Sequence, residues 1–519
     1  MDAKKGLLRS KNFMSGVFVL TLSTVIVKII GVLYKIPMLR LIGSEGMGYF
    51  NSAYEIYTLF CVISTAGLPV AMSVMISSSQ AQGKNRTAKI FSVGITLFLS
   101  LGIVCFAIIA GLAKPFSEFL KSDNAYLSIL FISPTVLFVC IGSAYRGYFQ
   151  GKGQMLPTAI SQVIEALGKL VLGIIFATVA LKRGYGTETV AAFAILGLTL
   201  GMAVSMLYLV FWKILNDRKK SEFAESDDTK KSTVLKELMV TAIPVTLASA
   251  IISITKLIDM TMILRRLQAV GYDSVAANEI YGSYTTLALP LFSLAPALVT
   301  AVALPLVPAI SAAAAKGDGE EQFKVMNSSL KLTCLLATPI SLGLCVFSKE
   351  ILSLLFAGEY EAIEVAYPLL SILGLSVLLS CLITVTNAVL QAYKKAHLPI
   401  VSMICGAGVK IVLAYFLIGN PGINIYGAPI STFFCNLTIT LMNFYYIGKY
   451  APMMPSLYRV FAKPLIYSAV AVGGAYAFMR YFESKLDLGI WTTVAAIMLA
   501  AIIYFAIVYF KKELKKDML

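Results

Sequence analysis

Residues 149–172 read FQGKGQMLPTAISQVIEALGKLVL, and residues 390–413 repeat the pattern as LQAYKKAHLPIVSMICGAGVKIVL. In both stretches a Gln at a predicted helix end precedes a basic loop, and Leu-Pro opens the next helix. A lysine, Lys169 or Lys410, then follows about three turns into that helix. Such self-similarity indicates that the chain contains two copies of one structural unit.

Weaker echoes occur in the same order in both halves. AGLPVAMSVMISSSQAQGK (66–84) is echoed by VALPLVPAISAAAAKGD (302–318), and AKPFSEFL (113–120) by SKEILSLLF (348–356). Each half holds an even number of predicted helices, so both halves share one orientation. They should be related by a pseudo-two-fold axis along the membrane normal.

Composition places the chain in a membrane. Its 519 residues are 58% hydrophobic and only 13% charged, whereas soluble domains carry about 25% charged residues. Apolar stretches of about 20 residues, long enough to cross a bilayer, recur along nearly the whole chain. We therefore predict an all-α polytopic membrane protein with about fourteen transmembrane helices. The predicted spans are 13–37, 50–78, 90–112, 125–145, 156–181, 190–213, 238–262, 281–308, 328–348, 365–388, 399–418, 425–447, 461–480 and 489–510.

These spans group into two lobes of six helices and a final pair. The N-terminal lobe is predicted at 1–215, the C-terminal lobe at 238–450, and two additional helices with a basic tail at 451–519. The segment 216–237 between the lobes is polar and dense in charge, which favours a solvated linker or surface helix. Most of the 43 Lys and Arg residues fall in loops on the side of this linker. The positive-inside rule then predicts that both termini are cytoplasmic.

Several other classes of protein are disfavoured. The net charge of +16 resides in short loops beside helix ends, where cations meet lipid headgroups, so a nucleic-acid partner is not expected. The eight cysteines fall inside predicted spans and are interpreted as small buried residues, without disulfides or metal ligands. We find no catalytic triad, nucleotide loop or metal cluster, and His397 is the only histidine. We therefore expect a transporter, not an enzyme, that depends on no cofactor.

Charged residues inside spans carry the functional information, because a charge at the bilayer centre costs at least about 2.5 to 3.5 kcal/mol. The cations outnumber the anions. They are Lys28, Lys35, Lys169, Lys256 and Lys410, against Glu55, Glu165 and Asp259.

The spacing of these charges suggests different roles. Glu165 and Lys169 are four residues apart, so we interpret them mainly as a structural ion pair on one helix face. Lys256 and Asp259 could pair in the same way, or Lys256 could bind substrate.

Lys28 and Lys35 lie on one face of the first helix, two turns apart, with no acidic residue on that helix. They form the predicted core of an anion-binding site. Two competing interpretations stay open: Lys35 and Arg40 could snorkel to the outer membrane surface, and Glu55 could pair with Lys35.

The eighth predicted span is rich in proline. Each proline removes a helix hydrogen bond, so we expect this helix to be bent, either for packing or at a substrate site. The prolines are Pro290, Pro296, Pro305 and Pro308.

A family resemblance adds to this interpretation. The residues that carry it are GVLYKIPMLRLIGSEGMGYFNSAYEIYTLFCVISTAGLPVAMSVMIS (31–77), AYRGYFQGKGQMLPTAISQ (144–162), its echo from Leu390, and the two C-terminal helices. They resemble the stage V sporulation protein B group of the multidrug/oligosaccharidyl-lipid/polysaccharide (MOP) exporter superfamily, which also contains MurJ-type lipid II flippases.

The resemblance implies a flippase for an undecaprenyl-pyrophosphate-linked cell-wall precursor, in peptidoglycan or spore cortex synthesis. The family's first-helix cations correspond to Lys28 and, within a residue, to Tyr34 and Lys35. Lysine stands here where MurJ-type proteins carry arginine, so point charges would replace bidentate contacts to phosphate.

The expected mechanism is alternating access, with Lys28, Lys35 and Lys256 holding the pyrophosphate. Glu55 and Asp259 are candidates for coupling to H⁺, Na⁺ or the membrane potential. We further expect a bacterial cytoplasmic-membrane location and a monomer that contacts membrane lipids and associates with cell-wall synthases.

Three alternatives stay open. They are a flippase for another lipid-linked polysaccharide repeat unit, a cation-coupled drug exporter of the same superfamily, and a membrane scaffold without transport activity. A drug exporter would need an acidic, aromatic cavity, which the surplus of buried lysines disfavours.

Overall fold

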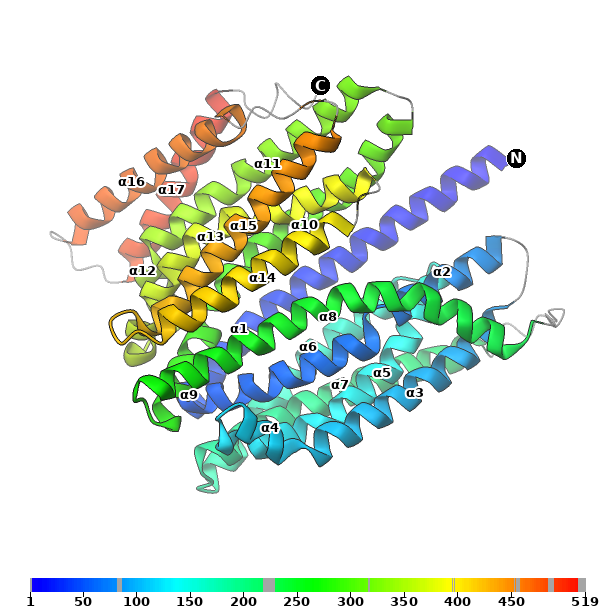
Figure 1. The fold of residues 1–519 in the computed structure, drawn as a ribbon, viewed down its shortest axis with the longest axis horizontal. Coiled ribbons are helices and arrows are strands. Elements are labelled where there is room, and N and C mark those ends of the chain that lie inside the picture. Colours follow the sequence, from blue (N-terminus) through cyan, green and yellow to red (C-terminus); the bar gives the residue numbers. More distant parts are fainter. Residues whose placement is uncertain are drawn as a thin grey trace. The chain divides into compact units, whose positions relative to one another are not determined.

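The computed structural model describes residues 2–81, 86–217, 229–315, 318–393, 395, 397–451, 453, 458–483 and 490–511 (Figure 1). Every regular element in these ranges is helical, which confirms the predicted all-α class. Within the described residues, twelve helical stretches are long and apolar enough to cross a membrane. All predicted spans except 238–262 overlap these stretches over most of their length, and the stretch Leu22–Gln80 covers the second span and residues 22–37 of the first.

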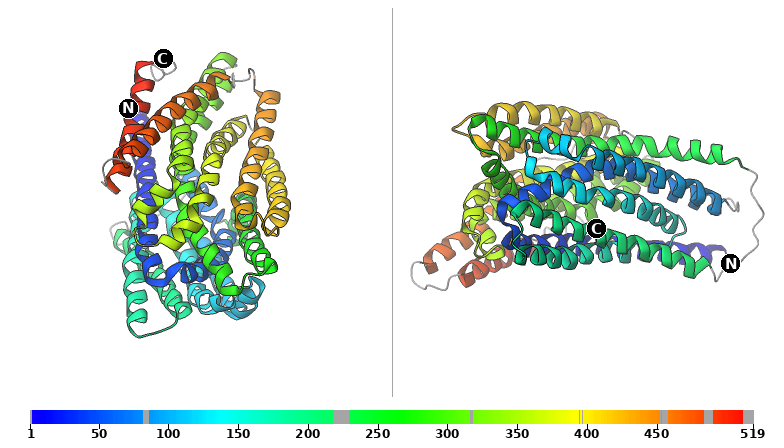
Figure 2. Two further views of the ribbon diagram at one scale, coloured as in Figure 1. Left: turned by 90° about the vertical axis from the view of Figure 1, so that its left-hand side faces the viewer. Right: turned by 90° about the horizontal axis from the view of Figure 1, so that it is seen from below.

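The chain divides by its internal contacts into two compact units, Met1–Arg265 with Tyr272–Gly282, and Arg266–Gly271 with Ser283–Leu519. We refer to them as unit 1 and unit 2. Within each unit the long helices lie roughly alongside one another (Figure 2). Unit 1 contains α1 (Asp2–Thr65), α2 (Leu68–Ala81), α3 (Thr87–Gly111), α4 (Ala113–Phe119), η1 (Asp123–Ala125), α5 (Tyr126–Gly151), α6 (Leu156–Lys182), α7 (Thr187–Asp217) and most of α8 (Lys231–Val270) and α9 (Ser274–Ser283). Unit 2 contains η2 (Tyr284–Ala288), α10 (Leu289–Ala315), α11 (Gly319–Val346), α12 (Ser348–Leu355), α13 (Tyr360–Ala392), α14 (His397–Ile418), η3 (Asn424–Tyr426), α15 (Gly427–Tyr450), η4 (Tyr458–Ala462), α16 (Lys463–Glu483) and α17 (Ile490–Phe510).

The repeat read from the sequence is also present in the helices. The echoing segments 113–120 and 348–356 form the short helices α4 and α12, each between two long helices. The Leu-Pro steps lie at the starts of α6 and α14, and Lys169 and Lys410 occupy the same position along those two helices. Packing partners repeat as well, because α6 lies against α7 as α14 lies against α15, and α5 against α7 as α13 against α15.

The segment between the first two predicted spans is helical and not a loop. α1 continues through it, interrupted only at Gly43, whose φ of 66° lies in the left-handed region that glycine tolerates. Met38 and Tyr49 in this segment are fully buried. Backbone groups beside buried side chains need internal hydrogen-bond partners, which a helix supplies.

α8 belongs by its contacts to unit 1, although the predicted lobe boundary at 216–237 would place it in the second half. Near its start, Lys89 donates a hydrogen bond to the Thr229 carbonyl at 2.6 Å. Midway, the Gly67 amide donates to Thr246 Oγ1 at 3.2 Å. Near its end, Arg265 donates to the Phe119 carbonyl at 2.7 Å. The division by packing therefore falls later in the chain than the division by repeat.

The proline-rich span is irregular where it begins. Residues Tyr284–Ala288 form a turn of π-helix, and Pro290 follows in the first turn of α10. Pro290 cannot donate the hydrogen bond that an α-helix would direct to the carbonyl four residues earlier, which favours a change of winding at this point.

Two glycine pairs bring α6 and α7 into close contact. A Cβ atom at Gly168 would lie 2.5 Å from the Cα atom of Gly201. One at Gly197 would collide with the backbone of Gly173. Small residues spaced in this way let membrane helices approach closely and gain van der Waals contact.

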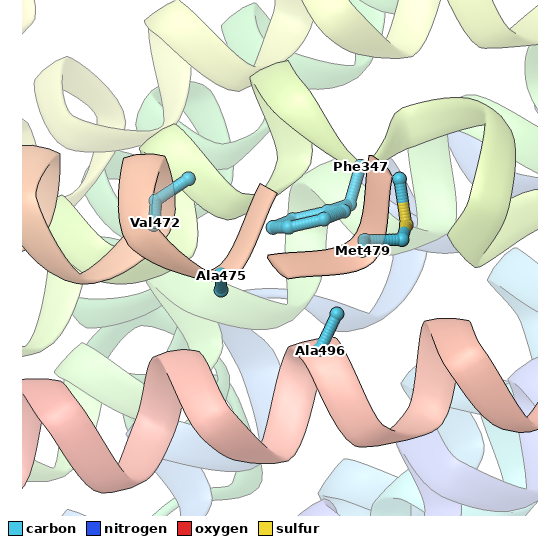
Figure 3. Packing of buried hydrophobic residues seen from close by; sticks show 5 residues of the cluster. All are labelled: Phe347, Val472, Ala475, Met479 and Ala496. Carbon is cyan, nitrogen blue, oxygen red and sulfur yellow. The ribbon is translucent and has the colours of Figure 1, made fainter. Parts of the chain in front are cut away.

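The two C-terminal helices pack on unit 2 through an apolar cluster. Figure 3 shows Val472, Ala475 and Met479 of α16 and Ala496 of α17 gathered around Phe347, which precedes α12. Nearby, the Tyr504 hydroxyl of α17 donates a hydrogen bond of 2.6 Å to the Leu335 carbonyl of α11. The final pair is therefore an integral part of unit 2.

Candidate functional site

A pocket of about 200 Å³ lies in unit 1 between α1, α6 and α7. Its wall combines two lysines, one glutamate and three tyrosines with apolar residues. The polar and aromatic members are Lys28, Tyr34, Tyr54, Tyr57, Glu165 and Lys169. Two of them, Lys28 and Lys169, were singled out in the sequence as intramembrane cations, and the structure brings them to one cavity.

Aromatic rings from both arms of α1 form one side of this pocket. The turn at Gly43 folds α1 back so that the Tyr34 and Phe50 rings lie 6.0 Å apart. Tyr54 stacks beyond Phe50 at 6.3 Å, and Tyr57 follows at 5.5 Å from Tyr54. The pocket is thus built on a continuous row of rings.

The ammonium of Lys169 rests against these rings. Its Nζ lies 4.8 Å from the centroids of Tyr34 and Tyr54 and 5.5 Å from that of Phe50. The negative faces of aromatic rings attract cations at such distances. Three rings therefore hold a lysine in place without neutralising its charge.

Glu165 makes its ion pair with Arg146 of α5, and not with Lys169. Arg146 Nη2 lies 2.9 Å from Glu165 Oε2, and Arg146 also donates to Ser161 Oγ at 3.0 Å and to Ser205 Oγ at 3.3 Å. The predicted structural pair of Glu165 and Lys169 is therefore corrected. Arginine offers several donors in a planar fork and can bond Glu165 while it also reaches α7.

The remaining predicted residues form an electrostatic cluster in unit 1. Lys35 is attracted by Glu55 and repelled by Lys169. Glu55 in turn is attracted by Lys256 and repelled by Asp259. Glu55 therefore attracts both Lys35 and Lys256.

Lys28 and Lys410 differ from these residues in their surroundings. Lys28 is exposed and lines the pocket. Lys410, the repeat counterpart of Lys169, is half-buried in α14 of unit 2. The repeat therefore does not duplicate the unit 1 pocket residue for residue.

Sequence reasoning missed Arg146, Tyr54 and Tyr57. Arg146 lies in the stretch AYRGYFQGKGQ, one residue beyond the predicted span, and its partner Glu165 is 19 residues away. The spacing of charges within a helix could not reveal this contact. All eight cysteines are free, as predicted, but Cys405 is exposed and not buried.

Comparisons with known proteins agree with the fold. A family model described as polysaccharide biosynthesis protein matches residues 13–314, and one described as MatE matches 244–416. Stage V sporulation protein B of Bacillus subtilis (strain 168) is 28% identical over 455 residues, covering 85% of this chain and 85% of that protein. Lipid II flippase MurJ of the same organism is 28% identical over 422 residues, covering 78% and 77%.

Solved structures show the same architecture. "Lipid II flippase MurJ, inward closed conformation" matches with a TM-score of 0.71 at 14% identity, over 96% of this chain and all of that one. An inward-facing multidrug resistance MATE family transporter of the MOP superfamily matches with a TM-score of 0.62 at 15% identity, over 80% and 97%. The resemblance seen in the sequence is confirmed. The family model described as polysaccharide biosynthesis protein matches more than half of the chain, residues 13–314. This multi-pass membrane chain therefore belongs to the polysaccharide biosynthesis protein family.

Proposed function

We propose that this protein is a flippase that carries lipid II from the inner to the outer leaflet of the bacterial cytoplasmic membrane by alternating access. The family and the relatives named above support a flippase for lipid-linked precursors or another MOP transporter. Lipid II as the cargo, cytoplasmic termini and a monomeric working state are parts of the proposal. So are the association with cell-wall synthases and a role in peptidoglycan or spore cortex synthesis.

The observation that carries the proposal is the surplus of lysines in unit 1. Lys35 and Lys256 are both attracted by Glu55, and Lys28 is exposed on the same helix as Lys35. These three lysines outnumber the two carboxylates, Glu55 and Asp259, that were predicted beside them. A pyrophosphate, which carries the opposite charge, would supply what is missing.

Each residue then has a stated role. Lys28, Lys35 and Lys256 act as point charges on the pyrophosphate, because an ammonium donates hydrogen bonds without the fixed fork of an arginine. Glu55 and Asp259 couple transport to H⁺, Na⁺ or the membrane potential by competing with the lipid for the same lysines. Substrate and ion then favour different states of the transporter, which is what coupling requires.

The test is transport of fluorescent lipid II in reconstituted vesicles. Lys35→Gln and Lys256→Gln should each lower the initial rate at sub-saturating lipid by about tenfold or more, since a hydrogen bond to a charged group contributes about 1.5–3 kcal/mol. The matched control is Lys410→Gln, a membrane lysine of unit 2, which should stay within about twofold of the wild type. Normal rates in both unit 1 variants would refute the cationic site.

The cargo is tested separately. A strain depleted of its lipid II flippase should grow when it expresses this chain. Two other cargoes are alternatives within the same superfamily, another lipid-linked polysaccharide repeat unit and a cationic drug. Failure to complement, together with transport of a cationic dye by the same vesicles, would favour a drug exporter, a possibility kept open by the structural likeness to MATE transporters.

A further inference from the structure

The end of α8 carries two consecutive arginines that anchor to different parts of the chain. Arg265 ends the long N-terminal stretch of unit 1, and Arg266 begins a short stretch that belongs to unit 2. Neighbouring residues on a helix point about 100° apart, so the two side chains leave α8 in different directions. The chain therefore crosses from one unit to the other between two anchored side chains.

Arg265 binds the end of α4, within unit 1. Its Nε and Nη2 atoms donate hydrogen bonds of 3.1 and 2.7 Å to the Phe119 carbonyl, and its guanidinium carbon lies 4.5 Å from the centroid of the Phe119 ring. Phe119 is the last residue of α4, and a helix end leaves such carbonyls without an intrahelical partner. A cation is also favourable at this negative end of the helix dipole.

Arg266 makes the same kind of contact with α14, within unit 2. Its Nε donates a hydrogen bond of 3.1 Å to the Tyr415 carbonyl, and its guanidinium carbon lies 4.1 Å from the centroid of the Tyr415 ring. Tyr415 lies in the last turn of α14, which ends at Ile418. A Cβ atom at Gly419 would collide with the Arg266 guanidinium, so the glycine makes room for it. Each arginine therefore caps a helix C-terminus and rests on the ring of the residue whose carbonyl it binds.

The two contacts differ in what they join within the repeat. Most of α8 and all of α14 lie in the predicted C-terminal lobe, 238–450, whereas α4 lies in the predicted N-terminal lobe, 1–215. The Arg266 contact therefore stays within one copy of the repeat, and the Arg265 contact joins one copy to the other. Arg265 is exposed, so water can replace its hydrogen bonds when the contact opens, whereas Arg266 is half-buried.

We propose that Arg265 is a releasable latch on α4 and that Arg266 is a permanent anchor on α14. When the two copies of the repeat rock, the latch opens and the anchor keeps α8 on α14. With cytoplasmic termini, the end of α8 lies at the outer face, so the open latch belongs to the outward-facing state. The inference rests on the alternating access of the proposed function, but it holds whichever cargo is carried.

Distances between spin labels test the latch and the anchor separately. Cysteines for labelling replace Lys114 of α4, Ala269 near the end of α8 and Val412 of α14, which are all exposed, in a Cys405→Ser background. The full chain in lipid nanodiscs, without lipid II, is measured by double electron–electron resonance. We expect a latched and a released population for the pair 114–269, and a single population for the pair 269–412.

Variants of the two arginines should act on different pairs. Arg265→Gln should raise the ratio of released to latched protein by about three- to tenfold, because hydrogen bonds from a charged donor are lost. Arg265→Lys keeps the charge without the planar fork and should give a smaller increase. Arg266→Gln should instead broaden the 269–412 distances. The matched control is Arg183→Gln, at an exposed arginine after α6, which should leave both pairs unchanged.

If Arg265→Gln does not fold, Phe119→Leu decides, because it removes the ring and keeps the carbonyl; it should raise the released fraction by less than Arg265→Gln would. A single 114–269 distance in every variant, or equal released fractions in the Arg265 variants and the wild type, overturns the latch. Equal broadening of both pairs by either arginine variant also overturns it, since the arginines would then be general structural contacts. Transport of lipid II by a protein with a single 114–269 distance would refute the latch and leave the proposed function standing.

Discussion

Replacing Arg146 with methionine removes hydrogen bonds from α5 to both α6 and α7. Arg146 donates to Glu165 at 2.9 Å, to Ser161 at 3.0 Å and to Ser205 at 3.3 Å. Hydrogen bonds between membrane helices contribute on average about 0.6 kcal/mol and at most about 1.7 kcal/mol. Three of them give a loss of about 2 kcal/mol in the free energy of unfolding.

The carboxylate left behind adds to this loss. Breaking a fully buried ion pair costs about 3–5 kcal/mol, because one charge loses its partner. The Glu165 side chain is 36% exposed, however, so water compensates part of that cost. We therefore expect Arg146→Met to lower the free energy of unfolding by about 2–3 kcal/mol, below the full buried-pair value.

A double-mutant cycle measures the pair directly. Equilibrium unfolding in mixed micelles is compared for Arg146→Met, Glu165→Gln and the double variant. The double variant should recover about 1 kcal/mol relative to the sum of the single changes, since neither charge is then left alone. Arg183→Met, at an exposed arginine after α6, is the matched control and should change stability by less than about 0.5 kcal/mol. Additivity within about 0.5 kcal/mol would refute the role of the pair.

Three more changes test other parts of the fold. Tyr504→Phe removes the hydrogen bond from α17 to α11 and should lower the free energy of unfolding by about 0.6–1.7 kcal/mol, measured by the same unfolding assay; no change would show that apolar packing alone holds the final pair. Asn443→Ala removes bonds of 2.8 and 3.0 Å from α15 to α13 and should cost a similar amount in that assay; a neutral result would contradict a stabilising network. Gly282→Ala directs a Cβ atom against the Ser44 carbonyl of α1 and should raise the labelling of a cysteine placed near Ser44. The control Gly473→Ala, which has open space around it, should not raise this labelling. Equal labelling in the two variants would refute close contact between α9 and α1.

Much of the fold could be predicted because its signals are local. Apolar length alone located the spans, and Leu-Pro marked the starts of α6 and α14 as predicted. The sequence did not show that the segment between the first two spans is helical on both sides of a break at Gly43, with Met38 and Tyr49 buried. Local composition does not show which side chains another helix will cover.

The site could be predicted only in part, for the same physical reason. Intramembrane charge is expensive, so Lys28 and Lys169 could be singled out from the sequence. Their surroundings depend on contacts over long separations, such as Arg146 with Glu165 and Tyr34 with Phe50. Spacing within one helix therefore suggested the wrong partner for Glu165.

The glycine contacts between α6 and α7 bear on how the pocket can change size. Gly168 and Gly173 meet Gly201 and Gly197 backbone to backbone, so the two helices have almost no slack between them. They form a stiff wall, whereas α1, which carries Lys28, turns at a glycine. We expect the pocket to open and close by displacement of α1 relative to α6 and α7, which stay fixed against each other.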